Sequence, residues 1–187
     1  MPATISGYWM YRFHPENNKF HRFTSQTAPV QNIFTLSDGD TWLFQSDGRL
    51  LRITPDEQAM ACRQILGSSH GVRRVISLVQ DKEIIWIISD KGIYKYSKEN
   101  SKLTLALSTR KHFHSFRKYA NKFIIGADNG QLYIYDPRKD DYSIMKFNTS
   151  ATLTRVKAYD SKHLLITAEN DGFFLTDGYR GEGVHYT

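Results

Sequence analysis

Short apolar segments alternate with short polar turns along the whole chain, and the same arrangement returns about every 40 residues. Each unit has an apolar strand-like run, a few small polar residues and a closing glycine, at residues 41–48, 85–92, 123–130 and 164–172. The closing glycines are 44, 38 and 42 residues apart. Helical periodicity is absent, so this repeat predicts short strands rather than helix pairs.

Each unit predicts four short antiparallel strands. In the second complete unit a first strand is expected at residues 72–79, followed by a polar turn and the apolar strand. A Gly-containing turn then leads into a third and a fourth strand, because Asp-Gly, Asn-Gly and Lys-Gly pairs tolerate the positive φ of tight hairpins. One such sheet cannot bury both of its faces, so neighbouring sheets must stack. The predicted fold class is all-β: a partial or small β-propeller with four-stranded antiparallel blades of about 40 residues.

The repeat divides a single propeller-type domain, residues 1–187, into blade pieces. The pieces are a half blade at 8–24, full blades at 30–66, 72–107 and 113–147, and an incomplete blade at 153–187. Three arrangements fit: the N-terminal pair completes the last sheet in a four-bladed ring, the chain is a slice of a larger ring, or two chains share one ring. An open slice exposes an apolar face and edge strands, so we expect a homo-oligomer.

Composition narrows the classes of partner. The formal net charge is +6, but no Lys/Arg run exceeds two residues, so we expect no nucleic-acid partner. The longest apolar run, residues 84–88, is too short to span a bilayer, so no membrane insertion is expected. Residues 1–7 do not form a signal peptide, which leaves a cytosolic chain or an excised piece of an exported protein. The single cysteine, Cys62, excludes an internal disulfide and is interpreted as a packed strand thiol.

The units resemble the two-component regulator propeller repeat. The segment 75–81 followed by 85–96, which contains Trp86, a Gly turn and an aromatic-basic-Tyr strand, matches that pattern closely. Residues 42–48 and 8–23 also match, whereas Ile124 and Leu165 replace the Trp in the last two units. The resemblance implies a fragment of the periplasmic sensor region of a bacterial hybrid two-component regulator, a family that typically senses oligosaccharides.

Basic residues provide the candidate site. Residues 100–127 contain six Lys/Arg and no acid, and residues 58–80 contain three Arg and no acid. The loops that lead into the first strands of propeller blades share one face of the ring, so these residues should gather at one mouth. Arg can hold a carboxylate or sulfate with two parallel hydrogen bonds. The alternative is a solvated rim that the turn aspartates partly neutralise. The candidate ligand-binding residues are His70, Arg73, Arg74, Arg110, Lys111, His114, Arg117 and Arg155.

No catalytic motif is present, so we expect a protein that is not an enzyme and that has no cofactor and no metal site. His112 and His114 lack further nominated ligands for zinc. Trp42 and Trp86 lie in apolar strands and are expected in the core rather than on a sugar-stacking surface. The leading hypothesis is a non-catalytic sensor with an oligosaccharide ligand. The alternatives are a protein-interaction scaffold and, less favoured, a propeller lyase using His114 with Arg117.

Overall fold

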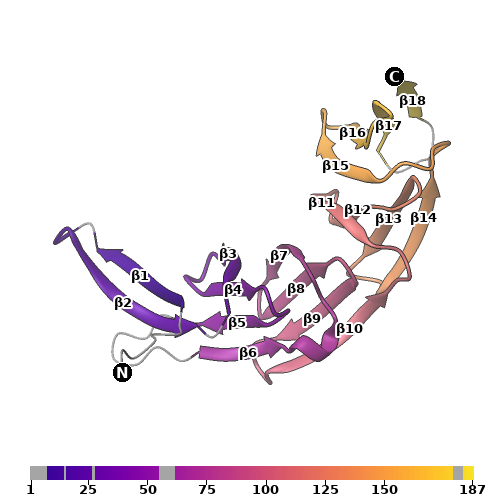
Figure 1. Ribbon diagram of the computed structural model, residues 1–187. Coiled ribbons are helices and arrows are strands. Elements are labelled where there is room, and N and C mark those ends of the chain that lie inside the picture. The colour runs from indigo at the N-terminus through magenta and orange to yellow at the C-terminus, as the bar shows by residue number, and fades with distance from the viewer. Residues whose placement is uncertain (1–7, 15, 27, 55–61, 179–182) are drawn as a thin grey trace. The chain divides into compact units, whose positions relative to one another are not determined.

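The computed structural model describes residues 8–14, 16–26, 28–54, 62–178 and 183–187 (Figure 1). They fall into two compact units, Met1–Arg74 and Val75–Thr187, and each is described by itself. The all-β prediction is confirmed, because the described residues form four four-stranded antiparallel sheets and one two-stranded sheet. Among the described residues, no helix is long and apolar enough to cross a membrane.

The first unit holds a two-stranded sheet, β1-β2, and a four-stranded sheet, β3-β4-β5-β6. Val30, Leu43, Leu51 and Ile53 form a small apolar cluster on the second of these sheets. Trp42 is fully buried, as the sequence predicts. The elements are β1 (Tyr8–His14), β2 (Lys19–Gln26), β3 (Val30–Thr35), β4 (Thr41–Gln45), β5 (Leu50–Ile53), β6 (Cys62–Leu66) and the short 3-10 helix η1 (Ser68–His70).

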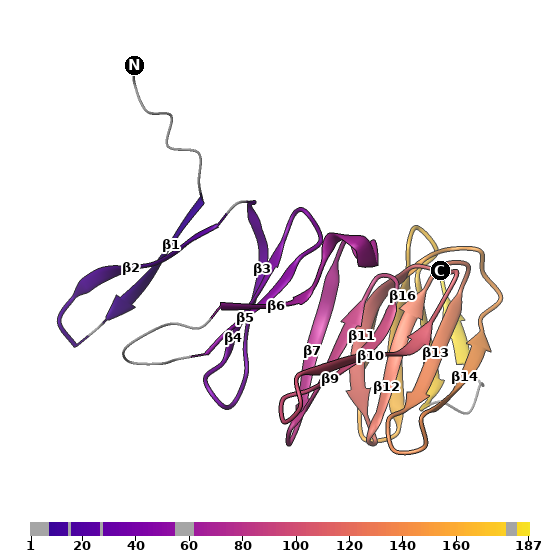
Figure 2. The same cartoon turned by 90° about the horizontal axis from the view of Figure 1, so that it is seen from below.

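The second unit holds three four-stranded sheets, each of which has its strands in sequence order. Figure 2 shows these sheets stacked against one another. The strands of the first sheet are β7 (Val75–Asp81), β8 (Ile84–Ser89), β9 (Gly92–Ser97) and β10 (Lys102–Ser108). Those of the middle sheet are β11 (Phe113–Tyr119), β12 (Lys122–Ala127), β13 (Gln131–Asp136) and β14 (Asp141–Lys146). Those of the last sheet are β15 (Leu153–Ala158), β16 (His163–Ala168), β17 (Phe173–Asp177) and β18 (Gly183–Tyr186).

Apolar side chains on both faces of the middle sheet explain why the three sheets stack. Phe123 and Ile125 of β12 face the first sheet, where they join Trp86 in one buried cluster. Ile124 lies between them in the sequence and belongs to a second cluster with Leu164 of the last sheet. Successive strand residues point to opposite faces, so a continuous apolar strand gives the middle sheet two dry faces.

Hydrogen bonds join successive sheets near their first strands. The amide of Phe113 donates to the carbonyl of Asp90, 3.1 Å away, and thereby links the middle sheet to the hairpin of the first. Ser115 Oγ donates to the carbonyl of Leu153 at 3.0 Å, and Tyr119 Oη donates to the carbonyl of Ser161 at 2.7 Å. These contacts join both ends of β11 to β15 and its following turn, so the two strands run in the same direction.

Two expectations require correction. The blade piece at 153–187 is not incomplete, because β18 pairs with β17 and supplies its fourth strand. Cys62 is exposed rather than packed, because it opens β6, the outermost strand of its sheet. The single propeller-type domain remains a prediction.

Candidate functional site

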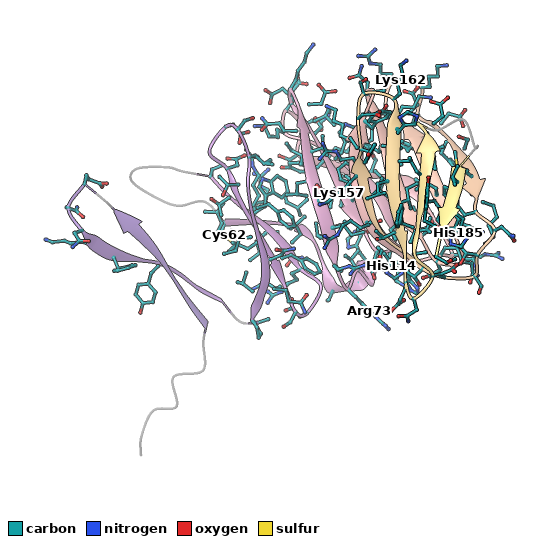
Figure 3. All side chains as sticks on the ribbon, turned by 90° about the horizontal axis from the view of Figure 1, so that it is seen from above. Cys62, Arg73, His114, Lys157, Lys162 and His185 are labelled. Carbon is teal, nitrogen blue, oxygen red and sulfur yellow. The ribbon has the colours of Figure 1, made fainter. Side chains whose placement is uncertain are left out.

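The candidate site lies at one end of the second unit, which we call the entry end because β7, β11 and β15 begin there. The antiparallel order brings the β8–β9, β12–β13 and β16–β17 turns to the same end. The opposite end, called the far end, carries the β15–β16 turn with Lys162. Figure 3 labels His114 and Lys162 toward these opposite ends.

A chain of four polar side chains spans the entry end of the first and middle sheets. Asp128, directly after β12, accepts a 2.6 Å hydrogen bond from Nε2 of His114 and a 3.0 Å bond from the amide of His112. Nδ1 of His112 lies 3.4 Å from Oδ2 of Asp128, the oxygen that also accepts from the His112 amide. Lys91 Nζ is 2.9 Å from Nε2 of His112. Because an ammonium only donates, Nε2 of His112 is the acceptor in this contact.

The electrostatics of this chain stabilise the ionised form of Asp128. Partial burial raises the pKa of Asp128, but the backbone N–H of His112 and the imidazole of His114 outweigh it, so the net pKa is lowered. The ionised carboxylate is thereby engaged by both histidines. Asp128 is one of the turn aspartates expected to neutralise part of a basic rim, and its contacts are with His112 and His114.

The structure places four of the five candidate residues of the second unit at the entry end. Arg110 and Lys111 lie in the connection between β10 and β11, His114 is the second residue of β11, and Arg155 is the third residue of β15. The start of β11 is joined to the start of β15 by the Ser115–Leu153 hydrogen bond. All four therefore lie at the entry end. Arg117 lies further along β11, toward the far end.

The other three candidates belong to the first unit. His70 ends the short helix η1, with its Nδ1 3.1 Å from the amide nitrogen of Gly67. Arg73 and Arg74 are exposed in the segment that follows. Convergence of all eight residues at one mouth therefore stays a prediction.

Three cationic side chains at the entry end could bind an anion. Arg110 and Arg155 are exposed and Lys111 is half-buried. Within the part of the chain that the structure describes, none of the three has an ion-pair partner. Guanidinium and ammonium groups without an ion-pair partner are suited to binding an anion, and the Asp128 carboxylate at the same end already contacts two histidines.

Sequence reasoning missed the roles of Lys91 and Asp128. The sequence Asp128-Asn129-Gly130 predicts a tight turn and gives no sign of these contacts. The signal that identifies them is the strand pairing: Phe113 pairs with Ala127, so the next residue after β12 lies opposite the residue before β11. A hairpin register of this kind places residue 128 beside residue 112.

Comparison with known proteins supports the fold. No protein-family model matches the sequence, and no curated protein matches it either. Among solved structures, the chain is similar to the extracellular domain of BT4673 from B. thetaiotaomicron, described as a one-component system, with a TM-score of 0.67 and 14% identity. That match covers 90% of this chain and 24% of the other.

Two further structures show the same likeness. One is the extracellular domain of BT4673 described as part of a hybrid two-component system, with a TM-score of 0.64, 16% identity, and coverage of 91% of this chain and 26% of that one. The other is the computationally designed Ika4 protein, with a TM-score of 0.61, 11% identity, and coverage of 82% and 93%. The chain thus spans about a quarter of the BT4673 domains. At these identities, the chain shares the fold of an extracellular domain of a two-component system.

Proposed function

We propose that this chain is a non-catalytic ligand-sensing segment of a β-propeller in a two-component regulator. In this proposal further blades close the ring, the segment works in the periplasm, and its ligand is an oligosaccharide with anionic groups. The observation that carries the proposal is the set of three cations, Arg110, Lys111 and Arg155, that have no ion-pair partner among the described residues, while Asp128 is held by two histidines. The structural likeness to an extracellular sensor domain supports the signalling role.

The energetics require several contacts to act together. Exposed ion pairs contribute about 1 kcal/mol or less each, so a single Arg gives little affinity. A polyanionic saccharide that reaches two or three of these cations adds their contributions. Its binding must then weaken with salt, because the screening length is about 8–10 Å in ordinary buffers.

The decisive experiment is calorimetry with a uronic-acid oligosaccharide and its neutral analogue, at low and moderate salt. We expect the acidic glycan to bind more tightly, with an affinity that falls as salt rises. Arg110→Ala combined with Arg155→Ala should weaken binding, whereas Lys162→Ala, a cation removed at the far end, should leave it unchanged. Equal affinity for the two glycans, or equal loss in both variants, would refute the proposal. Formation of an unsaturated uronate product would instead identify a lyase.

A second candidate function, an interaction scaffold, rests on the outer face of the last sheet. Phe173, Val184 and Tyr186 are exposed there, and the rings of Phe173 and Tyr186 stack with centroids 4.8 Å apart. The strand registers place Phe173 and Leu175 at the positions that Leu132 and Ile134 occupy in the middle sheet. There the next sheet of the repeat covers those positions. We therefore propose that a sheet of the same kind, from a second copy of this chain, covers the outer face.

A further inference from the structure

A cavity lies at the far end of the second unit, away from the cations of the entry end. It encloses about 130 Å³ between the first and middle sheets. Trp86 of β8 and Phe123 of β12 line it, together with Asp81 at the end of β7 and Lys118 near the end of β11. The turns that follow β11 and β13 add Asn121, Pro137 and Arg138 to the lining, and β7 adds Val79.

The floor of this cavity is aromatic and rigidly held. Trp86 packs edge-on against Phe123, with ring centroids 5.6 Å apart, and against Tyr135 at 5.7 Å. Both Trp86 and Phe123 are almost completely buried.

The rim of the cavity carries three charged side chains. Asp81, Lys118 and Arg138 are all exposed. None of these three side chains has an ion pair or a side-chain hydrogen bond among the residues that the structure describes. The rim therefore offers two cations and one carboxylate, and Asn121 adds a neutral donor and acceptor.

A cavity of this size sets the dimensions of its ligand. An apolar cavity of roughly 150 Å³ holds a benzene molecule, so this one takes a group of about six heavy atoms, either a whole small hydroxy acid or the carboxylate-bearing edge of a uronate ring. The two cations select a carboxylate, the Asp81 carboxylate accepts a hydrogen bond from a hydroxyl, and the aromatic floor covers an apolar C–H face.

We propose that this cavity binds a small hydroxycarboxylate, either as a free acid or as the terminal uronate of a saccharide. The carboxylate contacts Lys118 and Arg138, and the hydroxyl donates to Asp81. The site is distinct from the proposed sensing site because it lies at the opposite end of the strands and uses none of its residues.

The test is calorimetry on the intact chain with lactate and galacturonate, each paired with a neutral analogue, 1,2-propanediol and galactose. We expect at least one acid to bind and both neutral analogues to bind at least tenfold more weakly. Binding of lactate alone would identify the ligand as a free acid, and binding of galacturonate alone would identify it as the end of a saccharide. Either outcome supports recognition of a hydroxycarboxylate. The Trp86 indole N–H resonance should shift on binding. An absence of binding by both acids, or equal binding by the neutral analogues, would overturn the proposal.

Matched variants separate this site from the entry end. Arg138→Ala and Lys118→Ala should each weaken binding by about three- to tenfold, the loss expected for one exposed ion pair strengthened by a pocket. Lys139 is the neighbouring cation in the same turn and does not line the cavity. Lys139→Ala should therefore leave binding of the acid unchanged. If Arg110→Ala weakens binding and Arg138→Ala does not, the acid binds at the entry end and this inference fails while the proposed function stands.

Discussion

Ser115 and Leu153 form a buried hydrogen bond between the middle and last sheets. The buried hydroxyl of Ser115 donates to the carbonyl oxygen of Leu153 across 3.0 Å. Gly126 pairs with Ser115 on β12 and leaves room for this approach. A Cβ at position 126 would lie 2.6 Å from the Leu153 oxygen and closer still to the Ser115 hydroxyl.

Gly126→Ala should therefore destabilise the fold. Overpacking a dry interface typically costs about 1–3 kcal/mol, and here one obstacle is backbone that cannot rotate away. Urea denaturation would measure the loss in free energy of unfolding. Gly67→Ala is the control, because the nearest atom is the end of the flexible Gln64 side chain at 3.1 Å. Equal stability of Gly126→Ala and wild type would show that the two sheets separate easily.

The strands could be predicted because Gly-containing turn sequences mark where they end. The fourth strand of the last sheet and the exposure of Cys62 could not be predicted in this way. β18 has four exposed residues and no apolar run, so its pairing depends on β17 alone. The exposure of Cys62 depends on which strand is outermost, and that is a property of sheet order.

The candidate site could be predicted only in part, because its contacts also depend on how the strands pair. The sequence shows the basic residues as stretches that contain no acidic residue. The pairing register of β11 with β12 is needed to place Asp128 between His112 and His114. Strand pairing joins residues 16 apart in the sequence, a separation that local composition does not report.

Trp86→Ala should remove a large part of the stability of the second unit. Trp86 contacts Phe123 and Tyr135 across the first sheet interface, and emptying a buried aromatic site usually costs about 3–5 kcal/mol. Trp86→Phe keeps part of the volume and should cost less. Thermal denaturation would compare the two, and an unchanged melting temperature in Trp86→Ala would contradict the core assignment.

Asp160 should titrate well below an ordinary aspartate. The imidazole of His163 donates to its carboxylate, as do the amides of Lys162 and His163, and these bonds lower the pKa of Asp160 from 3.8 to about 2. NMR titration of the carboxyl carbon would give this midpoint. In His163→Ala the leading cause is removed, so the pKa should rise toward 3.8. A midpoint near 3.8 in the wild type would show that the turn is open in solution.

Asp128 should make stability depend on pH in the acid range. Its folded pKa is lowered, so the unfolded state takes up a proton first as the pH falls. The carboxylate therefore stabilises the fold above about pH 4, and this contribution is lost as the pH falls through the folded value. Asp128→Asn should lower stability at pH 7 by about 1 kcal/mol and flatten the acid limb of the stability profile. Asp177→Asn, the same change at an exposed position, should keep the wild-type profile; an unaltered acid limb in Asp128→Asn would contradict the assignment.

Self-association should depend on the outer face of the last sheet. Phe173 is 38% exposed and Tyr186 is 44% exposed, although the equivalent apolar positions of the middle sheet are covered by the next sheet. Uncovered apolar faces of this kind favour association, so sedimentation velocity should show a larger species as concentration rises. Phe173→Ser with Tyr186→Ser should shift the chain to the monomer. Tyr142→Ser removes a similarly exposed aromatic ring from β14 and should leave association unchanged. A wild-type chain that stays monomeric at every concentration, or equal effects of the two variants, would show that this face does not mediate assembly.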